Sequence, residues 1–223
     1  MRLISRISSP AAELPESYPM LKLYYSRASC AYAPHILLYD TEAEFQTEHI
    51  DFSKNEQNAP EFLRLNPKGR VPALQTADGI ITENPAILFY IAQLFPEKGL
   101  APRNSFDLAM AQAFNMYIAS TVHVAHAHKH RGYRWAETAA AHAEMSEKVP
   151  ENMASCAAMI QDHFFKGPFV LGREYSICDP YLALVTRWLP IDGVSLDDFP
   201  VLKEHHEMML QRPSLKRVSA LYD

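Results

Sequence analysis

Residues 66–74 read Asn-Pro-Lys-Gly-Arg-Val-Pro-Ala-Leu, and this stretch decides the fold. Residues 66–69 have the composition of a tight turn, because proline and glycine supply the backbone angles that turns need. Residues 70–75 then predict a short strand with Pro72 at its start, where a missing N–H disrupts no ladder. A cis bond before Pro72 would free the N–H and C=O of Val71 to pair with an extended, peptide-like ligand. A trans bond is the commoner alternative by base rate.

The segments on either side of this stretch predict a small α/β unit. Asp78-Gly79 indicates a hairpin turn, and Asn84-Pro85 predicts the N-cap and first turn of an amphipathic helix. Together the segments give the order β-α-β-α-β-β-α. The expected strands are 21–25, 45–52, 70–75 and 80–81, and the expected helices are 32–39, 59–65 and 84–95.

Beyond residue 95 the strand signals disappear. Residues 96–104 (PEKGLAPRN) have linker composition, and an apolar stripe with steps of three and four then predicts one long helix from Leu108 to Ala125. A Ser176-x-x-Asp179 capping box opens one of the later helices. Further helices are expected over 137–165, 176–188 and 199–212. We therefore expect a loose extension over 1–19, an α/β domain over 20–95, a linker over 96–104 and an all-α domain over 105–223.

Composition excludes several classes of protein. The 223 residues are 48% hydrophobic and 21% charged, which is typical of a globular chain. Twenty-one basic and 26 acidic residues give a net charge of −5, which argues against a nucleic-acid partner. Without a run of ~18 apolar residues, no membrane span is expected. Three scattered cysteines suggest reduced thiols and a cytoplasmic location.

Cys30 is the most reactive candidate in the sequence. It lies at the start of the helix predicted over 32–39, where unpaired N–H groups favour the thiolate. The alternative is a small buried hydrophobic residue, since free cysteines are often buried. Ala33 stands where a C-x-x-C motif would have its second cysteine, so a redox role would need an external thiol.

Glu83 and Asn84 place a carboxylate and an amide at a helix N-terminus. Capping of the helix alone explains Asn84. A helix N-terminus also attracts a ligand carboxylate, and Glu83 beside it can accept hydrogen bonds from an ammonium group. The pair would suit the head group of an α-amino acid.

With these residues in view, the sequence resembles the cytosolic glutathione transferases, most closely the bacterial beta class. The similarity extends from residue 20 to about residue 220. It rests on YYSRASCAYAPHI (24–36), NPKGRVPAL (66–74), TENPAI (82–87), ASTVH (119–123) and the Ser176-x-x-Asp179 box. The resemblance implies a thioredoxin-like N-terminal domain, an all-helical C-terminal domain, glutathione as co-substrate and a homodimer.

The resemblance also implies roles for individual residues. Pro72 would be a cis-proline and Val71 the main-chain partner of the cysteinyl group of glutathione. Glu83 and Asn84 would hold the γ-glutamyl end, although Asn84 replaces the small hydroxyl residue usual in the family. The remaining implied residues are Cys30, Ser29 and Ser26 near the sulfur, His123 and Ser120 in the groove, and Lys54 at the glycyl carboxylate. Val124 replaces a lysine that often follows the groove histidine.

The implied activity is attack of the glutathione thiolate on a small hydrophobic electrophile. In that reaction Ser26, Ser29, Cys30 and His123 would assist the sulfur, with Cys30 as a hydrogen-bond donor. The alternative enzyme reduces disulfides or peroxides through Cys30 as nucleophile and a mixed disulfide with glutathione. A non-catalytic protein that binds glutathione or apolar ligands is the third alternative.

The histidine run from His123 to His130 and four aromatic residues complete the set of candidates. His123, His126 and His130 share one helical face at a spacing that can chelate zinc, but a structural role is favoured and no metal is expected. Aromatic side chains at helical spacing are more often core than pocket wall, so none of the four is given a role. The four are Tyr117, Tyr133, Trp135 and Trp188.

Overall fold

A computed structural model describes residues 20–222, and the extension expected over 1–19 lies outside the described residues. The N-terminal part holds a four-stranded sheet in the order β2-β1-β3-β4. β1 runs parallel to β2 and antiparallel to β3, which pairs antiparallel with β4. The strands are β1 (Leu21–Tyr25), β2 (Phe45–His49), β3 (Ala73–Gln75) and β4 (Ile80–Thr82).

Turn chemistry sets the strand boundaries. Gly79 has a φ of 143°, which disfavours an L side chain, and its carbonyl accepts the N–H of Thr76 at 2.8 Å, closing the predicted hairpin. The expected second strand through residue 52 ends at His49 instead. There Asp51 accepts the N–H of Ser53 at 2.9 Å and starts a short 3-10 turn, so local side-chain bonding competes with the ladder.

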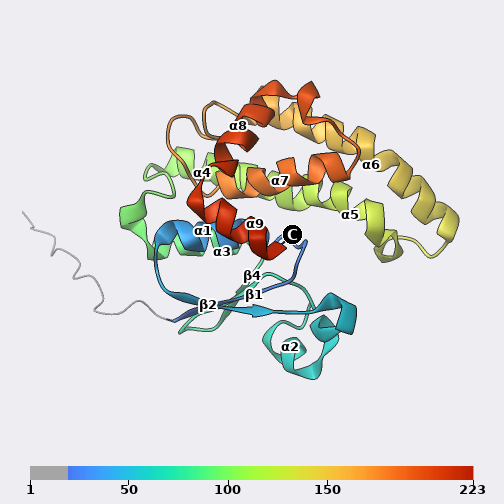
Figure 1. Cartoon of the computed structure of the whole chain (residues 1–223), viewed down its shortest axis with the longest axis horizontal. Helices are drawn as coiled ribbons and strands as arrows, with labels where there is room; N and C mark the ends of the chain where they lie inside the picture. Colours follow the sequence, from blue (N-terminus) through green and yellow to red (C-terminus); the bar gives the residue numbers. More distant parts are fainter. Residues whose placement is uncertain (1–19, 223) are drawn as a thin grey trace, which may run out of the picture.

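Helices cover both faces of the sheet (Figure 1). α1 (Tyr32–Thr41) and α3 (Asn84–Leu94) lie between the sheet and the helical domain, and α2 (Pro60–Leu65) packs on the other face. Under α2 a small separate cluster forms around Tyr24 and Phe62, whose rings are 5.9 Å apart. The predicted order β-α-β-α-β-β-α is confirmed.

The helical domain contains six α-helices among the described residues: α4 (Ser105–Tyr117), α5 (His123–Arg131), α6 (Ala139–Met159), α7 (Asp179–Ile191), α8 (Pro200–Leu210) and α9 (Pro213–Tyr222). A π-helical turn, Ile118–Val122, lies between α4 and α5, and a second, Ile160–Phe164, forms the end of the helix that contains α6. Short 3-10 turns are Phe52–Lys54, Glu56–Asn58, Pro96–Lys98, Gly132–Arg134 and Leu196–Asp198. None of the described helices is long and apolar enough to cross a membrane.

Two expectations for this domain need correction. The single helix expected from Leu108 to Ala125 contains a π-helical turn at Ile118–Val122, through which α4 continues directly into α5, and the stripe from Ala111 to Ala125 is buried as expected. The helix expected from residue 176 begins at Asp179, but the predicted capping contact is present, since the Asp179 carboxylate accepts the N–H of Ser176 at 2.7 Å and the Ser176 hydroxyl accepts the N–H of Cys178 at 3.3 Å.

α9 was not expected from the sequence, and it contacts the N-terminal domain. Leu215, Val218 and Tyr222 are buried along one face at helical spacing. The Tyr222 ring lies 5.3 Å from Tyr32 in α1, and the Tyr32 hydroxyl is 2.9 Å from that of Ser219. α9 therefore lies against the start of α1.

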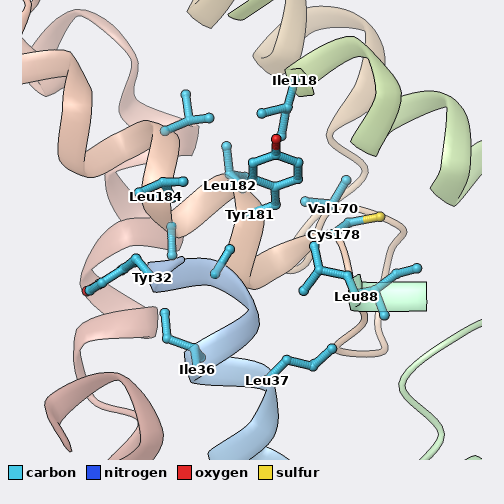
Figure 2. Close-up of a cluster of buried hydrophobic side chains, with 14 of the residues drawn as sticks. Tyr32, Ile36, Leu37, Leu88, Ile118, Val170, Cys178, Tyr181, Leu182 and Leu184 are labelled. Carbon is cyan, nitrogen blue, oxygen red and sulfur yellow. The ribbon is translucent and has the colours of Figure 1, made fainter. Parts of the chain in front are cut away.

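One continuous core joins the two domains. Figure 2 shows Tyr32, Ile36 and Leu37 of α1 in one cluster with Tyr181, Leu182 and Leu184 of α7, the Tyr181 ring pointing toward Ile118, and with Leu88, Val170 and Cys178 beside them. Because this interface is apolar, each domain buries surface that it would otherwise expose. A polar joint supports it: Asp40 accepts hydrogen bonds from Arg212 at 2.9 Å and from the Tyr175 hydroxyl at 2.5 Å.

Candidate active site

Cys30 lies in the turn between β1 and α1, directly before the N-cap residue Ala31. Its Sγ donates to the Val71 carbonyl oxygen at 3.6 Å. Burial raises the pKa of the Cys30 thiol to about 11, and Arg131 nearby lowers it to a smaller extent. The expectation that the helix terminus favours the thiolate is therefore wrong, because removal from water outweighs the helix dipole. A pKa raised to about 11 favours the neutral thiol at pH 7, although Cys30 is only half-buried.

The two serines of this turn bond to each other and hold its shape. The Ser29 hydroxyl donates to the Ser26 carbonyl at 2.6 Å, and the Ser29 N–H donates to the same carbonyl at 3.3 Å. Both residues are buried. Their hydroxyl and carbonyl groups fix the backbone on which Cys30 sits, so the structure shows them supporting the turn.

The Val71–Pro72 peptide bond is cis, as expected. β3 begins only at Ala73, so Val71 lies outside the ladder and is 8% exposed. Its carbonyl accepts the Cys30 thiol, while within residues 20–222 its N–H donates to no acceptor. An unpaired main-chain donor beside the Cys30 thiol is suited to an extended peptide ligand.

Glu83 and Asn84 differ from expectation. The N-cap of α3 is Glu83, with a left-handed φ of 73°, and Asn84 is the first helical residue. The predicted capping role of Asn84 is therefore wrong: its buried amide turns inward and donates to the Cys30 carbonyl at 2.9 Å. The exposed Glu83 carboxylate accepts the ammonium group of Lys68 at 2.6 Å. Asn84 thus links α3 to the Cys30 turn, and Glu83 points outward.

Lys54 and Ser120 are not brought to this cluster by any described contact. Lys54 is exposed and pairs with Asp51 at 3.2 Å in the 3-10 turn after β2. The exposed Ser120 donates its hydroxyl to the Met116 carbonyl of its own helix at 2.8 Å. Neither side chain contacts Cys30, Val71 or Glu83 among the described residues.

The helical domain contributes a histidine and aromatic side chains. The His123 ring lies 4.9 Å from the ring of Trp188, and burial together with neighbouring positive charge lowers its pKa to about 3. His126 stacks on Trp188 at 4.1 Å, and its Nδ1 is 2.7 Å from Asp192. His126 is therefore engaged in structure, and within residues 20–222 no three potential metal ligands come together.

A cavity of about 200 Å³ separates the Cys30 turn from the helical domain. Residues of the Ala28–Tyr32 turn face α5, α7 and α9 across it, and lining side chains include Tyr32, Arg131, Arg187, Trp188 and Tyr222. Of the four aromatic residues considered from the sequence, only Trp188 lines it. A larger depression of about 520 Å³ around Phe165 and His205 includes none of the residues predicted for the site.

Sequence reasoning missed Arg131, Arg187 and Tyr222. Arg131 lies eight residues after His123 on the same helix as the histidine run. The position of the run was therefore a usable signal for this side of the cavity. Tyr222 occupies the last described helix, and the Tyr222 hydroxyl is 3.4 Å from Nδ1 of buried His35. The spacing of Leu215, Val218 and Tyr222 was a usable signal for a helix, but the pattern does not predict that this helix packs against the other domain.

Comparisons with known proteins agree on one family. Residues 19–93 match the model described as "Glutathione S-transferase, N-terminal domain". A glutathione transferase homologue from Sulfitobacter, solved with bound glutathione, is 39% identical, covers 91% of this chain and 98% of its own, and has a TM-score of 0.88. The beta-class glutathione S-transferase of Sphingomonas chungbukensis is 29% identical with a TM-score of 0.74, covering 90% of this chain and 98% of its own. Glutathione S-transferase GstA of Escherichia coli O157:H7 is 27% identical over 88% of this chain and 96% of its own length.

Proposed function

The chain belongs to the glutathione S-transferase family and is a glutathione transferase, and we propose that it joins glutathione to small hydrophobic electrophiles in the cleft between its domains. The observation that carries this proposal is the edge formed by Cys30 and Val71. There a neutral thiol lies 3.6 Å from the carbonyl of a residue whose N–H is unpaired within residues 20–222.

Glutathione would lie along this edge as an extended chain. Its cysteinyl N–H and C=O would pair with the main chain of Val71, in the manner of an added strand. Its γ-glutamyl ammonium group would bind the Glu83 carboxylate and exchange with Lys68, which now occupies that oxygen at 2.6 Å. Lys54 and Ser120 remain predictions for the glycyl end and the groove.

The reaction would proceed through the glutathione sulfur. The thiol proton leaves to solvent, and the sulfur lone pair forms a C–S bond as the leaving group departs with the electrons of its own bond. Cys30 keeps its proton because burial raises its pKa to about 11. Its S–H would turn from Val71 toward the glutathione thiolate, and a hydrogen bond to an ionised acceptor is stronger than one to a carbonyl.

Thiol transfer through Cys30 is the second candidate. The observation in its favour is Arg131, whose positive charge lowers the pKa of Cys30. That effect is smaller than the effect of burial, which raises the pKa. Since only the thiolate attacks a disulfide, conjugation is supported better.

The test compares wild type and Cys30→Ala in two assays. Glutathione conjugation to 1-chloro-2,4-dinitrobenzene should fall by about tenfold or less, the worth of roughly one hydrogen bond. Glutathione-dependent reduction of a disulfide, if present, should disappear. Loss of conjugation in Cys30→Ala, together with a stable glutathione adduct on Cys30 of the wild-type protein, would contradict the proposal. Glutathione binding without turnover of any electrophile would favour a binding protein.

Two further properties are part of the proposal. A homodimer is supported by family resemblance, and sedimentation analysis measures it directly. A cytoplasmic location is supported by three unbridged cysteines, Cys30, Cys156 and Cys178, which are typical of a reducing compartment. Cell fractionation of the native protein tests the location.

A further inference from the structure

Arg131 introduces an unbalanced positive charge into the cleft. It is the last residue of α5, is half-buried, and lines the cavity opposite the Ala28–Tyr32 turn. Within residues 20–222 no carboxylate lies within ion-pair distance of its guanidinium. Burial lowers its pKa, which means that its surroundings do not compensate the charge that they enclose. A bound anion would supply that compensation.

The rest of the described cavity lining includes a second arginine and no carboxylate. Arg187 of α7 also lines it, with its guanidinium 5.2 Å from the Tyr32 ring. None of the described lining residues is an aspartate or glutamate. The nearby Asp192 is bonded to His126 at 2.7 Å and also faces Lys129 at 3.9 Å. The negative charge of Asp192 is therefore already paired with these two residues and does not face the cavity.

The remaining lining is mainly aromatic and apolar, with Ser29, His126 and His130 as its other polar residues. The Tyr32, Trp188 and Tyr222 side chains are at least 96% buried, and the cavity volume is about 200 Å³. This volume is below the ~300–1,000 Å³ of sites for drug-sized ligands, so the occupant is small. Aromatic walls favour a flat ring, and guanidinium groups favour a carboxylate or a similar planar anion.

We propose that the preferred electrophile is a small aromatic molecule with an anionic group, held with its ring in the cavity that Tyr32, Trp188 and Tyr222 line and its anion against Arg131. This inference rests on the proposed function and names the substrate class of the same cleft. Arg131 is then a residue that determines specificity. It supplies a positive charge at a different place from the family lysine that Val124 replaces in this chain.

A chloronitrobenzoate illustrates the reaction. The glutathione thiolate attacks the carbon that bears chlorine and forms the C–S bond, and chloride leaves with the electron pair of the C–Cl bond. The thiol proton has passed to solvent. The carboxylate takes no part in the bond changes and serves only to bind and orient the ring.

The experiment uses 4-chloro-3-nitrobenzoate and 4-chloro-3-nitrobenzamide, which share a ring and leaving group and differ in charge. For each, kcat/KM is divided by the uncatalysed rate constant with glutathione, so that intrinsic reactivity cancels. The wild-type protein should favour the benzoate by about tenfold, which is the lower range for a charge-assisted hydrogen bond. The difference should appear mainly in KM.

Matched variants locate the effect. Arg131→Met should lower the benzoate-to-benzamide ratio by about tenfold, and Arg131→Lys should restore part of it. Arg134→Met is the control, because Arg134 carries the same charge, is exposed three residues further along and does not line the cavity. It should leave the ratio within about twofold.

A second measurement does not depend on the folding of any variant. Benzoate should inhibit turnover of 1-chloro-2,4-dinitrobenzene by the wild-type protein more strongly than benzamide does, and added salt should weaken the difference. Equal inhibition, or a benzoate-to-benzamide ratio near one while the benzamide is turned over, overturns this inference and leaves the proposed function standing. Equal slowing of both substrates by Arg131→Met overturns it also, since Arg131 would then serve glutathione. Absence of turnover with any electrophile overturns the proposed function itself.

Discussion

The thioredoxin-like domain borders the cleft with main-chain groups, the Cys30 thiol and the Glu83 carboxylate, whereas the helical domain borders it with arginine and aromatic side chains. On the first wall, the Val71 N–H and carbonyl and the Cys30 thiol are held by the serine turn and the cis bond. On the second, Arg131 and Trp188 project from α5 and α7. Main-chain groups do not change with the amino-acid sequence, so the thioredoxin-like side of the cleft binds the same ligand in different variants. Side chains do change, so a single substitution on the helical side can alter which ligand is bound.

The largest expected effect on stability comes from removing the polar contact of Asp40 with Arg212 and Tyr175, which joins the two domains. Asp40→Ala would leave Arg212 and the Tyr175 hydroxyl without their shared acceptor in a mostly buried site. We expect a loss of about 3 kcal/mol in the free energy of unfolding and a Tm lower by about 6–12 °C. Asp197→Ala removes a carboxylate from an exposed pair with Lys203 and should leave Tm nearly unchanged, as measured by thermal denaturation. Equal shifts in the two variants would mean that this joint does not hold the walls together.

Each wall also encloses a histidine whose pKa burial lowers: His35 to about 4 and His123 to about 3. In the unfolded chain a histidine is protonated below about pH 6.5, whereas His35 in the folded protein is protonated only below about pH 4. Between these pH values the unfolded state binds one more proton than the folded state. His35 therefore supports the folded state fully above pH 6.5, and this support is lost as pH falls toward 4.

His35→Phe tests this linkage. Between pH 7 and pH 5 the free energy of unfolding should decrease by about 2 kcal/mol less in the variant than in wild type. Denaturant titrations at the two pH values give the difference, with His49→Phe at an exposed position of β2 as control. An unchanged pH slope in His35→Phe would show that His35 takes no part in acid sensitivity.

A smaller effect is expected where α3 meets the Cys30 turn. Asn84→Ala removes the amide that donates to the Cys30 carbonyl at 2.9 Å and also the buried Asn84 oxygen, which has no partner among the described residues. The two changes partly offset each other, so we expect a loss of about 1–2 kcal/mol and a higher KM for glutathione. Asn58→Ala, at an exposed amide, is the control for both measurements. A full-affinity Asn84→Ala protein would mean that the turn keeps its shape without this contact.

Glu83→Gln is expected to change binding rather than stability. The Glu83 carboxylate is 66% exposed and bonds only the mobile end of a lysine side chain among the described residues, so Tm should stay close to wild type. The KM for glutathione should rise by about tenfold, because a neutral amide binds the γ-glutamyl ammonium group less well. Steady-state kinetics with Glu61→Gln as control measures this, since Glu61 is likewise exposed in the first turn of a helix. A rise shared by both variants would point to a general charge effect.

The two walls also differ in how far the sequence predicts them. Turn chemistry is local, so the turns at residues 66–69 and Asp78-Gly79 were predictable, and the order of strands and helices follows from them. The cis bond before Pro72 was implied only by the family resemblance, because the residues alone favour a trans bond. The arrangement of Arg131 beside Tyr32 depends on how α5 packs across a domain boundary, and no local pattern carries that information. For the same reason α9 was missed as a partner of α1.

At Cys30 and Asn84 the local sequence predicts a different outcome from the one in the folded protein. A helix terminus does favour a thiolate, but Cys30 is half-buried in the folded chain, and this burial raises its pKa. Asn84 has the composition of an N-cap, but Glu83 adopts the capping position with a φ of 73° and frees the amide for Cys30. Both outcomes depend on tertiary burial.

The ionisation of Cys30 tests the account most directly. Site-resolved mass spectrometry of iodoacetamide-treated protein gives the alkylation rate of Cys30 as a function of pH. We expect the rate to keep rising beyond pH 9 toward a pKa of about 11, so that the attacking sulfur at neutral pH belongs to glutathione. A midpoint below pH 8 would contradict it and identify Cys30 as the nucleophile.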